Sequence, residues 1–129
     1  MNVRIDEKIL VSNIRVRFPS QAALTDQWLA QRGWKIEDHN DLPYMWVEAF
    51  ADWITDAIKR RDVAGIRDQT GFLADQYRAA PDALWEIVAV AYAENIMWNA
   101  SDEEKAWAWE FIAREIQQLY EEMWRDPTT

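Results

Sequence analysis

The segment from Trp46 to Ile58 constrains the fold most strongly, because its apolar residues recur every three to four positions. That spacing gives a helix one apolar face, which must be buried against other elements. The apolar face consists of Trp46, Val47, Phe50, Trp53, Ile54, Ala57 and Ile58. Pro43 precedes this face, at a position where proline favours the first turn of a helix. The sequence therefore predicts an amphipathic helix that begins near Pro43.

Similar periodic segments follow one another along the chain, and few turn residues separate them. With three Gly and four Pro in 129 residues, the sequence predicts an all-α fold. Further helices are expected at about residues 6–18, 21–32, 63–79, 82–99 and 102–125. The first of these is ambiguous, because residues 4–18 also alternate as short strands do, and the helix is favoured.

Helix boundaries are marked by capping and breaking residues. Candidate N-caps are Ser20, Asp62 and the Ser101–Glu104 capping box. Residues expected to end a helix are Pro19, Gly33 and Pro127. These signals place short turns between long helices.

The arrangement of apolar residues predicts one core. Residues 82–99 are apolar nearly all round, so they are expected to form the central buried helix. Four tryptophans are expected in the core: Trp28, Trp46, Trp53 and Trp85. We interpret residues 1–129 as a single helical domain, a bundle of about five to six helices with basic N-terminal helices (1–35) and acidic helical hairpins (43–125). Stacking of the hairpins as in HEAT repeats is an alternative description.

The composition indicates the cellular compartment in which the protein is expected. There is no Cys, which excludes disulfides and thiolate metal sites and favours a reducing compartment. The N-terminus lacks the pattern of a signal peptide, and no run of 18 apolar residues occurs. A cytoplasmic protein that does not enter a membrane is expected.

The charge is unevenly distributed. The net charge is −9, with +3 in residues 1–35 (six basic, three acidic) and −12 in residues 36–129 (eight basic, twenty acidic). Such a field repels nucleic acid and attracts cationic partners, although acidity also serves solubility.

Residues for catalysis or metal binding are scarce. His39 is the single histidine, and no Gly-rich phosphate loop, nucleophile elbow or Glu-x-x-Glu pair is present. We therefore expect no catalytic residue, no metal and no cofactor, and we interpret the protein as a binding protein and not an enzyme.

An acidic row lies on the polar face of the helix that starts near Pro43. Glu48, Asp52 and Asp56 are spaced at i, i+4 and i+8, where like charges repel by a few tenths of a kcal/mol per pair. Thr55 and Lys59 share this outward face with them, Met45 lies beside it, and Lys59 is expected to pair with Asp56. The row is either a solvated helix face or a surface that binds basic side chains of a partner.

Two further groups are candidates. Glu94 falls on an apolar part of the 82–99 helix and is expected to be buried. It would either line a pocket or pair with an arginine, such as Arg15, Arg17, Arg67 or Arg78. In the last helix two tryptophans lie away from the apolar stripe, with carboxylates nearby. This second partner-binding group comprises Glu103, Glu104, Trp107, Glu110 and Trp124.

Two stretches carry a resemblance to a known family. They are YMWVEAFADWITDAI and FLADQYRAAPDALWEIVAVAYAENI, followed by an acidic last helix, over about residues 43–125. The chain resembles the small acidic all-α immunity proteins of bacterial polymorphic-toxin and contact-dependent inhibition systems. The resemblance implies a cytoplasmic protein that neutralises a cognate toxin domain, often a nuclease, by occluding its active site or an essential surface.

Two other functions fit the same residues. The first is a small helical ligand-binding domain or enzyme with a pocket around Glu94. The second is an adaptor that forms a homodimer through its Trp-rich faces.

Overall fold

The computed structural model describes residues 5–35 and 42–124, and within them the chain forms seven α-helices and no strand. The helices are α1 (Ile5–Arg17), α2 (Pro19–Ala30), α4 (Pro43–Lys59), α5 (Val63–Ala79), α6 (Pro81–Glu86), α7 (Asp102–Ala108) and α8 (Arg114–Trp124). The all-α prediction is confirmed, and the ambiguous first segment is a helix. The predictions for His39, Pro127 and the helix end at 125 lie outside the described residues.

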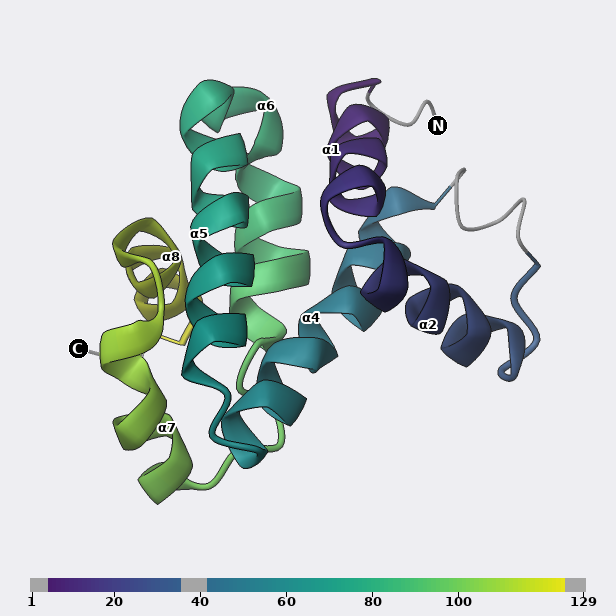
Figure 1. The fold of residues 1–129 in the computed structure, drawn as a ribbon. Helices are drawn as coiled ribbons and strands as arrows, with labels where there is room; N and C mark the ends of the chain where they lie inside the picture. Colours follow the sequence, from purple (N-terminus) through teal and green to yellow (C-terminus); the bar gives the residue numbers. More distant parts are fainter. Residues whose placement is uncertain (1–4, 36–41, 125–129) are drawn as a thin grey trace.

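Helix α4 occupies the centre of the fold and packs against α1, α2, α5 and the segment that follows α6. Figure 1 shows it running obliquely between the α1–α2 pair and the α5, α7 and α8 side of the molecule. The predicted apolar face is buried as expected, with Trp46, Phe50 and Ile54 fully enclosed. One cluster of buried side chains draws on helices from both halves of the chain. A single shared core therefore describes the molecule better than stacked repeats.

The predicted helix boundaries are partly correct. Asp62 caps α5 by accepting a hydrogen bond from the Gly65 amide, and the Ser101–Glu104 capping box is formed in both directions. Gly33 has a φ of +92°, as its predicted place after a helix requires. Helix α1 ends at Arg17, just before Pro19 as predicted, but the Ser20 N-cap was predicted wrongly. Pro19 starts α2, where its missing N–H costs nothing, and the N-cap is Phe18 without a side-chain bond.

The two longest predicted helices are interrupted. After α6, residues Ile87–Tyr92 form a π-helical segment and Ala93–Asn95 a 3₁₀ turn. The side-chain Nδ2 of Asn95 donates to the carbonyl oxygens of Val90 and Ala91, at 3.1 and 2.9 Å. It thus satisfies backbone acceptors where the regular pattern of helical hydrogen bonds ends.

The last predicted helix breaks between α7 and α8, after a 3₁₀ turn at Trp109–Phe111. Ile112 is extended there, and neighbouring side chains replace the lost hydrogen bonds. Thr70 Oγ1 accepts from the Ala113 amide at 3.1 Å, and Gln117 Nε2 donates to the Trp109 carbonyl at 2.7 Å. These partners come from α5 and α8, so the break depends on tertiary structure.

The core prediction fails for two tryptophans. Trp46 is buried and Trp53 is partly buried, but the Trp28 and Trp85 side chains are 40% and 41% exposed. Helix α2 packs through Ala22, Thr25 and Leu29, which turns Trp28 outward.

A polar cluster fixes α1 and α2 to α4. Asp26 accepts hydrogen bonds from both terminal nitrogens of Arg15, at 2.7 and 2.9 Å. The indole Nε1 of Trp46 donates to the same carboxylate at 2.9 Å. The Arg15 guanidinium also lies over the Trp46 ring, 4.8 Å from its centroid. This cluster sets the position of α2 beside α4, and hence of Trp28 beside the acidic row.

Candidate binding groove on helix α4

The polar face of α4 forms part of the wall of a groove. It consists of two adjoining depressions with volumes of about 470 and 190 Å³, which share Trp28, Ala49 and Asp52. We call them together the α4 groove. Its lining residues are Thr25, Trp28, Leu29, Arg32, Trp34, Met45, Glu48, Ala49, Asp52, Trp53, Asp56, Asn95 and Trp98.

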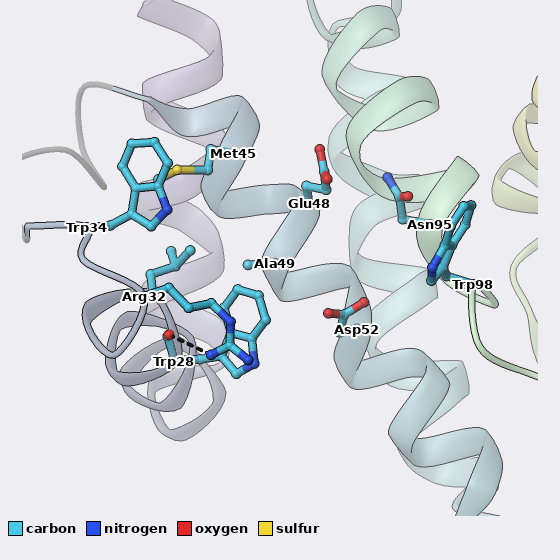
Figure 2. Close-up of a pocket in the computed structure, with 10 residues that line it drawn as sticks. Trp28, Arg32, Trp34, Met45, Glu48, Ala49, Asp52, Asn95 and Trp98 are labelled. Carbon is cyan, nitrogen blue, oxygen red and sulfur yellow. Dashed lines mark hydrogen bonds between the residues drawn. The ribbon is translucent and has the colours of Figure 1, made fainter.

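The acidic row lies inside this groove. Glu48 and Asp52 line the larger depression and Asp56 the smaller one. Figure 2 shows Glu48 and Asp52 on α4 between two sets of side chains, with Trp28, Arg32 and Trp34 on one side and Asn95 and Trp98 on the other. Glu48 and Asp52 are exposed, as the predicted outward face requires, but they line a depression and not a free helix face.

The expected ion pair between Lys59 and Asp56 is not formed. Asp56 instead accepts a hydrogen bond from Arg60 Nε at 2.8 Å, one turn further along the chain. Lys59 reaches across to Glu104, with 3.3 Å between Nζ and Oε1. Within the described residues, Glu48 and Asp52 form no salt bridge.

One wall of the groove is a stacked pair formed by Trp28, in the last turn of α2, and Arg32, just after the helix ends. The Arg32 guanidinium carbon lies 3.5 Å from the centroid of the Trp28 ring. Its Nη1 donates to the Trp28 carbonyl oxygen at 3.1 Å. A cation at this distance from an indole face is attracted by the ring quadrupole. Trp34 and Met45 extend this wall away from the stack.

The opposite wall is Trp98, whose side chain is 61% exposed. Its ring packs against Trp124, with 6.1 Å between the centroids. The indole Nε1 of Trp124 in turn donates to the Glu94 carbonyl oxygen at 2.9 Å. Thr55 Oγ1 donates to the Ile96 carbonyl oxygen at 2.8 Å and ties this turn to α4. Thr55 is therefore buried, contrary to its predicted outward position.

The groove is electrostatically negative. The pKa of Asp52 is raised chiefly by desolvation of its carboxyl and next by the nearby Glu48 carboxylate, whereas the Arg32 guanidinium lowers it. Burial also raises the pKa of Tyr44, with further contributions from Glu48, Glu94 and other acids. Negative charge thus extends beyond the groove toward Tyr44.

Glu94 does not occupy the predicted buried site. Its side chain is half-buried and does not line the groove, although Asn95 next to it does. Of the proposed arginine partners, Arg15, Arg17 and Arg78 pair with other acids, and Arg67 lies over Phe111. The preceding π-helical segment turns Glu94 away from the direction that a regular helix would give it.

The second predicted group of partner-binding residues is not brought together with the groove. Glu104 serves the capping box, and the hydrogen bond from the Ser101 amide is the main cause of its lowered pKa. Trp107 packs between Phe111 and the Arg61 guanidinium. Glu103 and Glu110 are exposed elsewhere on α7 and the turn after it. Only Trp124 has a link to the groove, through Trp98.

Sequence reasoning missed the aromatic walls. Trp28 and Arg32 are four residues apart, a spacing at which helix side chains meet, and this signal could have revealed the stack. Trp34, Asn95 and Trp98 carry no comparable signal, because their positions depend on a turn and on the π-helical segment.

The chemistry available in the groove is ion pairing and stacking. Carboxylates accept hydrogen bonds from cationic donors, and exposed indole rings stack on the same cations. No group of three or more potential metal ligands occurs in residues 5–35 and 42–124. In the same part of the chain no helix has the length and apolar character needed to cross a membrane.

The fold and the groove define an all-α protein with an acidic, aromatic-walled groove on helix α4. The chain belongs to the DUF7674 family, a domain of unknown function whose model matches residues 13–125. No curated protein matches the chain, and no solved structure matches it. The family model therefore spans nearly the whole fold.

Proposed function

We propose that this protein is an immunity protein, which binds a cognate basic toxin domain in the cytoplasm and occludes its active site or an essential surface. The observation that carries the proposal is the pair of carboxylates Glu48 and Asp52, which lie between aromatic walls without a salt bridge among the described residues. A concave surface of this kind fits basic side chains of a protein partner.

The charge of the chain supports a basic partner. A net charge of −9 attracts cationic proteins and repels nucleic acid phosphates. The negative field around Tyr44 extends the groove's field to α6 and α1, through Glu86 and Glu7. Association steered by such a field is faster than that of neutral partners.

The aromatic walls offer a source of binding affinity that exposed charges do not provide. Exposed charges add little net affinity, whereas tryptophans that become buried on binding are typical energetic anchors of protein interfaces. Trp28 and Trp98 are 40% and 61% exposed, so each has surface to lose on contact. Neutralisation by this route is steric and electrostatic, and it needs no chemistry from this chain.

The test uses the purified C-terminal domain of the protein encoded immediately upstream. We expect an equimolar complex, inhibition of the domain's activity, and an association rate that falls steeply as salt rises. A salt-independent rate would contradict steering. A basic domain that is neither bound nor inhibited would contradict the proposed function.

A further inference from the structure

The groove already holds one guanidinium group, that of Arg32. It is stacked on Trp28, with 3.5 Å between the guanidinium carbon and the ring centroid, and its charge acts favourably on Asp52. The indole face and the Trp28 carbonyl thus hold this arginine on the wall, and Asp52 acts on it only at longer range. The stack shows, within the protein itself, how an indole ring of the groove contacts a guanidinium group.

The opposite half of the groove has the same components but no cation of its own within the described residues. Trp98 presents an exposed ring there, and Glu48 and Asp52 lie one helical turn apart between the two walls. The packing of Trp124 against Trp98 and the bond from Thr55 to the Ile96 carbonyl hold this wall in place.

We propose that this half of the groove binds an arginine side chain of the partner between Trp98 and the Glu48–Asp52 pair. The inference rests on the proposed function, since it names the side chain by which a basic toxin domain would be held. The larger depression, of about 470 Å³, lies within the roughly 300–1,000 Å³ usual for ligand pockets.

Arginine fits this site better than lysine. Its planar guanidinium stacks on an indole and donates to two carboxylate oxygens at once. Lysine is a compact and strongly hydrated charge, and its ammonium group cannot form the same flat stack. A row of two acids beside a tryptophan therefore selects for guanidinium.

The test compares two peptides, acetyl-Gly-Arg-Gly-amide and acetyl-Gly-Lys-Gly-amide. Each is titrated into ¹⁵N-labelled protein while the indole N–H signals are followed, with Trp98 assigned from the Trp98→Phe variant. The arginine peptide should shift the Trp98 signal saturably and bind about fivefold more tightly, the ratio that corresponds to a cation–π contact of about 1 kcal/mol. Equal binding of the two peptides, or no saturable shift, would overturn the assignment.

A matched pair of variants locates the site. Glu48→Gln/Asp52→Asn should abolish the preference for arginine, whereas Glu121→Gln/Glu122→Gln, which removes two exposed acids of α8 outside the groove lining, should preserve it. Unchanged binding by the first variant would also overturn the assignment. Circular dichroism checks that both variants remain folded.

The two proposals fail separately. If the arginine peptide binds as expected but the upstream toxin domain is not bound, the arginine site stands and the immunity function falls. If the toxin domain depends on Glu48 and Asp52 but the peptides show no preference, the immunity function stands and the arginine site falls.

Discussion

The hydroxyl of Thr55 donates a 2.8 Å hydrogen bond to the carbonyl oxygen of Ile96, and so joins α4 to the turn that carries Trp98. Thr55 is buried, so both partners are shielded from water. The bond connects the acidic face of α4 to the aromatic wall opposite, and the shape of the groove depends on it.

Replacing Thr55 by Val tests this link. The substitution keeps the shape but leaves the Ile96 carbonyl without this donor, so the free energy of unfolding should fall by about 1–2 kcal/mol. Urea denaturation measures the loss, and the indole N–H signal of Trp98 should move. Thr55→Ser keeps the hydroxyl and should retain most of the stability; an equally large loss in that variant would show that the methyl group matters and the hydrogen bond does not.

The Asp26 cluster should contribute more stability than the surface ion pairs. Asp26→Ala removes three hydrogen bonds, from Arg15 and Trp46, and leaves a partly buried guanidinium without this partner. We expect a loss of about 2 kcal/mol in the free energy of unfolding. The control is Asp68→Ala, which breaks an exposed pair with Arg17 and should cost less than about 1 kcal/mol. Similar losses in the two variants would be evidence against the cluster's structural role.

Asp52 should weaken the fold at neutral pH. Its pKa is raised in the folded state, so folding favours the protonated form, and this contribution to stability is present below the ordinary value of 3.8 and lost as pH rises through the folded pKa. Asp52→Asn removes the penalty, but the side chain is exposed and solvent screens its charge, so the free energy of unfolding at neutral pH should rise by no more than a few tenths of a kcal/mol.

Urea denaturation across the acid range checks the sign of this effect. The advantage of Asp52→Asn over the native protein should shrink as the pH falls through the folded pKa toward 3.8, and it should be absent well below 3.8, where the carboxyl is protonated in both states. A variant that is less stable than the native protein at neutral pH would mean that the attraction between Asp52 and Arg32 outweighs burial and Glu48.

Local patterns were enough to predict α4 and the acidic row. The apolar period of α4 is strong, and Pro43, Asp62 and Ser101 act through neighbours within four residues, so the sequence contains the information. The aromatic walls could not be predicted in the same way. Trp98 follows a π-helical segment whose extra residue per turn rotates all later side chains relative to a regular helix.

The groove also arises from contacts that are distant in sequence. Asp26 and Trp46 are twenty residues apart, and Thr55 and Ile96 forty-one. Helical periodicity assigns each residue to a face of its own helix but not to the element opposite. It therefore identified Glu48 and Asp52 correctly as outward-facing, but gave no sign that aromatic side chains flank them on both sides.

The central claim is that the acidic residues of the α4 groove bind the basic partner. The most direct measurement is the dissociation constant of the upstream toxin domain for three proteins: the native chain, Glu48→Lys/Asp52→Lys, and Glu121→Lys/Glu122→Lys. The last two carry the same change in net charge, so long-range steering affects both alike. We predict that the groove variant, still folded, loses binding by about a hundredfold or more, as expected when close charge pairs at an interface are reversed, while the α8 variant binds nearly as the native chain does. Equal weakening in the two variants would contradict the claim.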